Sequence, residues 1–134
     1  MFRAVAINLF ARYSVLRYKM NPSCLFCKIA SGDAPANIVY QDDLVTAFRD
    51  IHPVAPIHVL IVPNKHIPSL SHAEEEDENI FGRLFTVARK VAEMENISEG
   101  GYRTIINTGV QGGQTVLHLH LHVIGGQRMR YPIG

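Results

Sequence analysis

The amino-acid sequence predicts an α+β domain that has a mainly antiparallel five-stranded sheet, one long helix and a short N-terminal helix. Three observations favour this fold class. Five short segments are rich in apolar and β-branched residues, one longer segment repeats its apolar residues every three to four positions, and the segments follow in the order helix, three strands, long helix, two strands. That order is typical of an α+β domain.

The first elements are a short helix and a hairpin. Residues 24–30 form an apolar turn, and Ser31-Gly32-Asp33 ends the helix that this turn predicts. Residues 37–40 and 44–48 are predicted as two strands of a hairpin that turns at Asp42-Asp43.

The middle of the chain supplies a buried strand and the long helix. Residues 57–63 are almost continuously apolar and β-branched, as expected of a central strand. Ser71 and Glu74 match a capping box, and the apolar residues that follow keep helical spacing until residues 94–96. The last two strands are predicted at residues 102–107 and 116–124.

The composition limits the classes of partner that the chain can bind. Its 134 residues suit one domain, and 47% hydrophobic with 19% charged residues is a globular composition. Thirteen basic and 12 acidic side chains leave a net charge of +1, which gives no electrostatic argument for nucleic acid or for an anionic membrane. No apolar run reaches the ~18 residues of a membrane span. We therefore expect neither a nucleic-acid partner nor a membrane.

The N-terminal segment 1–20 is expected to be a tail outside the domain, which then covers residues 21–134. Its first nineteen residues carry Arg3, Arg12, Arg17 and Lys19 without any acidic residue. This pattern resembles an organellar targeting peptide, although Met20 is also a candidate start. A loose tail predicts a cytoplasmic protein, and a targeting peptide predicts a mitochondrion or another organelle.

Three histidines alternate with aliphatic residues in the last predicted strand. Successive strand side chains point to opposite faces, so His118, His120 and His122 are predicted on one face at repeats of about 7 Å. A single histidine is usually a surface or satisfied core residue, whereas three in strict alternation favour a functional site. No acidic residue lies in the strand, and the preceding Gly112-Gly113-Gln114-Thr115 is suited to approach an anion. The pattern therefore favours phosphate binding over a catalytic three-histidine metal site.

These residues resemble the histidine-triad (HIT) nucleotide-binding superfamily. His118-Leu-His120-Leu-His122-Val-Ile is similar to its His-φ-His-φ-His-φ-φ motif, in which φ is apolar. Other segments match in order and spacing: Cys24-Leu-Phe-Cys27-Lys-Ile, Phe48-Arg-Asp50-Ile51, Pro56-Ile-His58-Val-Leu-Ile-Val-Pro63, Lys65-His66, Asn107 and Gly112-Gly-Gln-Thr115. Gly125-Gly-Gln-Arg-Met-Arg-Tyr-Pro-Ile-Gly134 is similar to the C-terminal signature of the Hint branch. The resemblance covers roughly residues 23–134 and implies a HIT-like fold.

The resemblance implies roles for matching residues. His120 would be the nucleophile that attacks the α-phosphorus and holds the nucleoside monophosphate covalently, which suits imidazole near neutral pH. His122 would contact the phosphate and leaving group, His118 would orient His120, and His58 would face the phosphate. The other implied nucleotide contacts are Asp50 on the ribose hydroxyls, Ile51 and Phe26 beside the base, and Asn107, Gly113, Gln114 and Thr115 on the ribose–phosphate segment.

Members of the Hint branch are homodimers that hydrolyse purine nucleoside 5′-phosphoramidates, in which AMP is linked to an amine. The resemblance thus implies a homodimeric hydrolase of AMP-type substrates that requires no cofactor for catalysis. Tyr131 stands where this branch typically has tryptophan, and Ile133 replaces a proline. These departures concern the leaving-group preference rather than the nucleotide site.

The two cysteines have three interpretations. Several bacterial members and the related uridylyltransferases hold a structural zinc ion with Cys-x-x-Cys and two histidines, which correspond to Cys24, Cys27, His66 and His118. The thiols are alternatively free and buried, or a redox pair.

Two other functions stay open. One is a dinucleoside polyphosphate hydrolase of the Fhit-like kind, although that branch usually lacks the C-terminal signature found here. The other is a nucleotide-binding regulatory module with little turnover.

Overall fold

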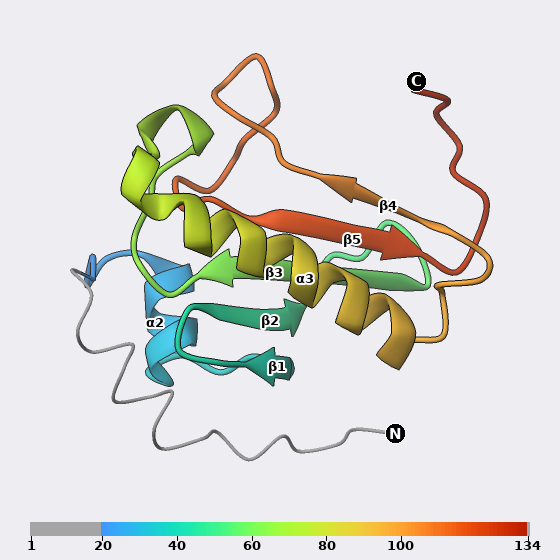
Figure 1. Ribbon diagram of the computed structural model, residues 1–134, viewed down its shortest axis with the longest axis horizontal. Coiled ribbons are helices and arrows are strands. Elements are labelled where there is room, and N and C mark those ends of the chain that lie inside the picture. Colours follow the sequence, from blue (N-terminus) through green and yellow to red (C-terminus); the bar gives the residue numbers. More distant parts are fainter. Residues whose placement is uncertain (1–19, 134) are drawn as a thin grey trace.

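The computed structural model describes residues 20–133 (Figure 1). The predicted tail and its targeting alternative therefore lie outside the described residues, apart from Met20. Nowhere in the described chain is there a helix long and apolar enough to cross a membrane. The cytoplasmic location stays a prediction.

A five-stranded antiparallel sheet forms the centre of the domain, with strand order β1-β2-β3-β5-β4. The strands are β1 (Ile38–Gln41), β2 (Val45–Arg49), β3 (Ile57–Pro63), β4 (Tyr102–Ile105) and β5 (Leu121–Gly125). The helices are α2 (Leu25–Ser31) and α3 (Glu78–Met94), and α3 is preceded by two short 3₁₀ turns, η1 (Leu70–His72) and η2 (Glu75–Asp77). The α+β prediction is confirmed.

The long helix α3 covers one face of the sheet (Figure 1). Its apolar side buries Leu84, Val87 and Val91 against strand residues such as Ile61 and Val123, all of which are inaccessible to solvent. Alternation along the strands sends the neighbouring side chains to the opposite face.

The short helix α2 packs on that opposite face. Phe26 and Ile29 contact Phe48, Leu60 and Val62, which form a second and smaller apolar cluster. Gly32 ends α2 with a left-handed backbone (φ 85°), a conformation that favours glycine. This helix covers only part of the face, so the remainder stays open for a site.

The predicted boundaries differ from the structure by more than one residue at three places. β4 ends at Ile105 rather than at residue 107. The last strand begins at Leu121 rather than at residue 116, because the backbone before it bonds elsewhere: the Leu119 N–H donates to the Ile67 carbonyl over 2.7 Å. The predicted capping box at Ser71 and Glu74 is also wrong. Ser71 lies inside η1, and the reciprocal box forms between Glu74 and Asp77.

Candidate active site

Two neighbouring rows of side chains cross the open face of the sheet, which we call the histidine face. Cross-strand pairing puts Phe48, Leu60, His122 and Ile105 in one row. His58, Ile124 and Arg103 form the next row, and Asp50 extends it because its N–H donates to the His58 carbonyl. Directly paired residues of an antiparallel sheet share a face, so both rows project to the same side.

A cavity of about 550 Å³ lies on the β2–β3 half of the histidine face. Its walls are largely apolar and come from α2 and the sheet, including Phe26, Ile29, Phe48 and Leu60. His120 and His122 stand at its polar end. The size and the mixture of apolar walls with a few polar groups suit a small-molecule ligand such as a nucleoside.

The structure brings most of the predicted ligands to this cavity. The predicted nucleotide ligands that line it are Phe26, Asp50, Ile51, Thr115, His120 and His122. Asn107, Gly113 and Gln114 are not among the lining residues. Gln114 instead shapes its own loop, because its amide donates to the carbonyls of Pro68 and Val116 and accepts the N–H of Gly109. Nucleotide contacts by these three residues stay predictions.

Glycine at position 112 has a physical reason in this loop. A Cβ atom there would lie 2.3 Å from the Thr108 carbonyl oxygen, which no side chain tolerates. The loop 108–115 can therefore close tightly only with glycine at this position.

Only one of the three alternating histidines is part of the sheet. His122 belongs to β5, whereas His118 lies in a bend and His120 in irregular chain before the strand. The rings of His120 and His122 remain neighbours, with centroids 5.0 Å apart. His118 is fully buried and joins a different group of side chains from the cavity.

Backbone groups determine which nitrogen of His120 carries the proton. Its Nδ1 lies 2.7 Å from the His118 carbonyl, and because a carbonyl only accepts, Nδ1 must donate. Neutral His120 thus has its free electron pair on Nε2. His118 is held in the same way, since its Nε2 donates to the Pro63 carbonyl over 2.8 Å and leaves the electron pair on Nδ1.

A second chain of hydrogen bonds fixes His58 and His122. The Val54 N–H donates to His58 Nδ1 over 3.1 Å, so the proton of neutral His58 is on Nε2. His58 Nε2 donates to His122 Nδ1 over 2.9 Å, with the Asp50 carboxylate 3.3 Å away as a second acceptor. His122 must then carry its proton on Nε2, an atom that is buried without any partner in the described structure. An unsatisfied buried donor beside a free electron pair is suited to an anionic ligand.

Burial keeps these imidazoles neutral. It lowers the pKa of His122 to about 4, with the neighbouring His120 and His58 adding to the effect and Asp50 opposing it. Burial also lowers the pKa of His58, which the Asp50 carboxylate partly offsets. Both rings are therefore uncharged at neutral pH, which agrees with the tautomers that the hydrogen bonds require.

The two cysteines meet two histidines at the N-terminal end of α2. Cys24 and Cys27 Sγ lie 3.3 and 3.5 Å from His118 Nδ1, and His66 Nδ1 is 3.3 Å from both Cys27 Sγ and His118 Nδ1. Tetrahedral zinc separates two nitrogen ligands by about 3.3 Å and a sulfur from a nitrogen by about 3.5 Å. The four residues thus fit a metal ion of this kind.

The protonation of the four candidate ligands also suits a bound metal ion. Burial, together with the neighbouring Cys24, raises the pKa of the Cys27 thiol to about 11, so a thiolate there needs a cation beside it. The bond from His118 Nε2 to the Pro63 carbonyl leaves Nδ1 free to coordinate, as outer-shell bonds to metal-ligating histidines usually do.

Possible metal-ligand atoms of Asp50, His58 and His122 also lie within 4.8 Å of one another. They fit a metal less well, because the Val54 N–H keeps the proton of His58 on Nε2, the atom that would have to coordinate. The hydrogen bonds and the ion pair among these three side chains explain why they lie close together.

The family model of the HIT domain matches residues 31–129. The chain belongs to the HIT family. This HIT protein is 53% identical over 115 residues to the purine nucleoside phosphoramidase of Escherichia coli strain K12, covering 86% of this chain and 93% of that protein.

Solved structures of HIT proteins share the fold. A HIT family hydrolase from Legionella pneumophila Philadelphia 1 superposes with a TM-score of 0.80 at 46% identity, covering 84% of this chain and all of that one. A zinc-bound histidine triad protein from Mycobacterium smegmatis gives a TM-score of 0.70 at 32% identity, covering 81% of this chain and 78% of that one. The HIT-like fold expected from the sequence is confirmed.

Sequence reasoning missed several groups that shape the site. Val54 and Pro63 act through backbone atoms, which no side-chain pattern reveals. Phe48 and Leu60 could have been found from the strand register, since both share a row with His122.

The lowered pKa of His122 predicts a specific pH dependence of stability. The unfolded ring titrates near pH 6.5 and the folded one near 4, so the stabilisation from a neutral His122 is present above pH ~6.5 and is lost as the pH falls towards ~4. The free energy of unfolding, measured with urea, should fall more between pH ~7 and pH ~4.5 for the wild type than for His122→Gln. Equal losses in the two proteins would contradict the assignment.

Proposed function

We propose that this HIT protein hydrolyses purine nucleoside 5′-phosphoramidates through a covalent nucleotidyl-His120 intermediate. One observation carries the proposal: the free Nε2 electron pair of His120 and the unpartnered Nε2 proton of His122 stand together at the polar end of a nucleoside-sized cavity. The 53% identity to a purine nucleoside phosphoramidase supports it.

The base and ribose would occupy the apolar cavity. Phe26 and Ile51 lie on its wall and rim, where a purine ring can pack against them. Asp50 retains acceptor capacity for ribose hydroxyls in addition to its contacts with His58 and with the His52 N–H. Thr115, Asn107, Gly113 and Gln114 are proposed along the ribose–phosphate segment.

In the first step, the electron pair of His120 Nε2 forms a bond to the α-phosphorus, and the phosphorus–nitrogen bond breaks. The bonding electrons leave with the amine nitrogen, which takes one proton from the site. The proposed donor is His122 in its protonated form, which takes up a proton from solvent because a bound phosphoryl anion raises its pKa from the low value that burial imposes; after the transfer the ring is neutral again. The Nδ1–H bond to the His118 carbonyl stabilises the positive charge that develops on His120.

In the second step, water attacks the phosphorus and the bond to His120 breaks. The electron pair returns to Nε2, AMP leaves, and the water supplies one proton back to the site. Protons therefore balance over the two steps. Splitting the displacement in this way is the general advantage of a covalent intermediate.

A His120→Ala variant tests the proposal. With an AMP phosphoramidate of a fluorescent amine, the wild type should release amine and show a transient mass gain of one nucleotidyl group after acid quenching. The variant should lose at least ~10³-fold in rate, because no other group offers a free electron pair at that position.

A matched His72→Ala variant, which changes an exposed histidine that does not line the cavity, is the control. Cleavage of dinucleoside polyphosphates without phosphoramidase activity would favour the Fhit-like alternative. Nucleotide binding without either reaction would make the protein a binding module and refute the proposal.

We further propose that Cys24, Cys27, His66 and His118 hold a structural zinc ion. The ligand distances and the zinc-bound relative from M. smegmatis support this. When bound, zinc would stabilise the two thiolates and tie α2 to the segment that carries His118. The purified protein is expected to contain about one zinc per chain and to lose thermal stability with a chelator.

His66→Gln should abolish zinc retention, whereas His72→Gln, which changes an exposed histidine outside the cluster, should keep it. Metal analysis and thermal unfolding provide both readouts. A metal-free wild type that unfolds at the same temperature with and without chelator would leave free thiols as the correct interpretation.

A homodimer is proposed through the outer edge of β4. This strand is at the end of the sheet order and exposes Tyr102 and Thr104, and an edge of this kind can pair with a second copy. Sedimentation equilibrium should give about twice the 15.0 kDa chain mass.

Thr104→Lys would bring two like charges together at that edge and should shift the protein towards monomer. Thr86→Lys, on the exposed side of α3, should not. A wild-type mass of one chain, or equal effects of the two substitutions, would contradict the proposed interface.

A further inference from the structure

The cysteine–histidine cluster, formed by Cys24, Cys27, His66 and His118, includes the residue whose carbonyl holds the His120 ring. We propose that this cluster is also a redox switch: a peroxide joins Cys24 and Cys27 in a disulfide, which slows the reaction at His120 by loosening His118. The inference concerns the regulation of the hydrolase proposed above and rests on that function.

The two thiols are placed to form a disulfide within one chain. Cys24 is the N-cap residue of α2 and Cys27 follows about one helical turn later, so their side chains are neighbours. Both sulfur atoms lie within 3.5 Å of the same atom, His118 Nδ1, and the Cys27 N–H donates to Cys24 Sγ. The sequence contains no other cysteine, so neither thiol has a competing partner in the chain.

The two thiols differ in their access to solvent. Cys24 is partly exposed, whereas Cys27 is fully buried. A peroxide therefore reaches Cys24 first, and Cys27 is protected from direct oxidation. An exposed thiol beside a second, resolving thiol is the usual arrangement of reversible redox sites.

The oxidation proceeds in two steps. The Cys24 thiolate attacks one oxygen of the peroxide, the O–O bond breaks, and the departing oxygen becomes water after protonation. The Cys27 thiolate then attacks the sulfur of the resulting Cys24 sulfenic acid. The S–S bond forms, the S–O bond breaks, and the second oxygen also leaves as water. In total the two thiols lose two electrons and two protons, and one hydrogen peroxide becomes two water molecules.

The disulfide removes partners from a buried nitrogen. His118 Nε2 donates to the Pro63 carbonyl, so Nδ1 has an electron pair that needs a proton donor or a cation. Thiols supply a donor and a pair of thiolates can hold a cation, but a disulfide does neither. Among the described residues only His66 then faces Nδ1. Because His118 is inaccessible to solvent, water does not replace the lost partners.

Two contacts transmit this change from the cluster to the nucleophile. The His118 carbonyl accepts the His120 Nδ1 proton over 2.7 Å, so a shift of His118 turns the His120 ring. Phe26, between the two cysteines in sequence, packs edge-on against His118 and His120, with ring centroids 5.9 and 5.3 Å apart. A misplacement of about 1 Å near a reacting group costs up to ~10²-fold in rate, so even a small shift is measurable.

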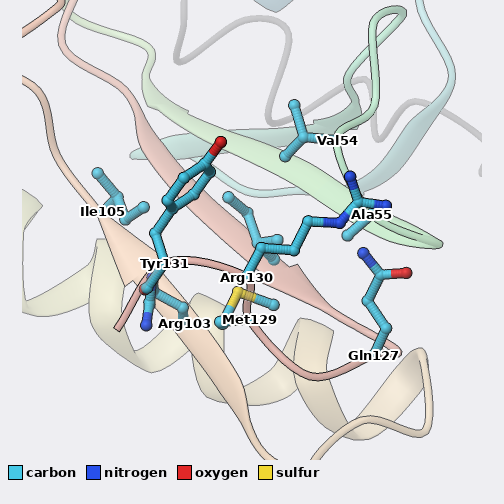
Figure 2. Close-up of a pocket in the computed structure, with 9 residues that line it drawn as sticks. Val54, Ala55, Arg103, Ile105, Gln127, Met129, Arg130 and Tyr131 are labelled. Atoms are coloured by element: carbon cyan, nitrogen blue, oxygen red, sulfur yellow. The ribbon is translucent and has the colours of Figure 1, made fainter. Parts of the chain in front are cut away.

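The other side of His122 has no such connection to the cluster. A hollow of about 190 Å³ lies there between β4, β5 and the C-terminal segment, and its lining includes Val54, Ile105 and Tyr131 (Figure 2). No hydrogen bond within residues 20–133 joins the residues of this hollow to the cluster. The disulfide should therefore slow the attack by His120 equally for substrates that differ only in their amine.

Peroxide treatment of the purified full chain tests the switch. After reaction with hydrogen peroxide, the chain should lose the mass of two hydrogen atoms relative to the reduced chain, and any zinc that it held should appear in solution. The kcat/KM for an AMP phosphoramidate should fall about tenfold, equally for two different amines, and dithiothreitol should restore it.

Two variants serve as controls, each compared with itself before and after oxidation. Cys27→Ser cannot form the disulfide, so peroxide should cause no loss that dithiothreitol reverses. His66→Gln keeps both cysteines but lacks one candidate zinc ligand, so it should still lose and regain activity. If Cys27→Ser does not fold, reversal in the wild type decides, because Cys24 and Cys27 are the only cysteines.

Thiols that stay reduced, a disulfide that links two chains, or a disulfide that leaves kcat/KM unchanged would overturn the switch. A loss confined to one amine would also overturn it, because the effect would then lie in the hollow of Figure 2.

If the reduced protein hydrolyses no phosphoramidate, the proposed function fails instead, and AMP binding decides about the switch. Calorimetry should give a Kd for AMP at least about threefold higher for the disulfide form, because Phe26 lines the nucleoside cavity. Equal affinities of the two forms would refute the coupling.

Discussion

The hydrogen bond from His120 Nδ1 to the His118 carbonyl is the contact on which the rest of the site depends. It spans 2.7 Å and leaves the electron pair of His120 on Nε2, the atom available to a ligand. The His118 carbonyl can hold the His120 ring in this way only because His118 is itself held in place. Its ring is fully buried, bonded to the Pro63 carbonyl and in contact with both cysteines. The cysteine–histidine cluster and the proposed nucleophile are therefore mechanically one unit.

The histidine face explains how one sheet can serve both the main core and the site. Its first row gives Phe48, Leu60 and His122 to the nucleoside cavity. α3 seals the other face, so no part of the site has to contribute to the main core. Alternate residues of each strand thus face either the core or the site. The site can therefore carry unsatisfied hydrogen-bond donors without weakening the core.

The family relationship and the geometry support the same chemistry through different evidence. The identity to a phosphoramidase is a property of 115 aligned residues together, whereas the tautomers follow from individual bonds to backbone groups. The backbone contacts are the more specific, because they determine which nitrogen of each neutral ring carries the free electron pair. A neutral site of this kind is selective for ligands that bring their own negative charge, since the phosphoryl group then supplies the partner that His122 lacks.

The sequence by itself determined the fold class, the long helix and the residue types of the site, because hydrophobic periodicity and the alternation of His118, His120 and His122 are local properties. It could not determine where β5 begins, since Leu119 gives its N–H to Ile67, a residue distant in the chain. Nor could it separate His118 from the other two histidines or find the backbone groups of Val54 and Pro63. Those features were decided by the tertiary structure, because hydrogen bonds to backbone atoms depend on which segments meet in space and leave no signature in side-chain order.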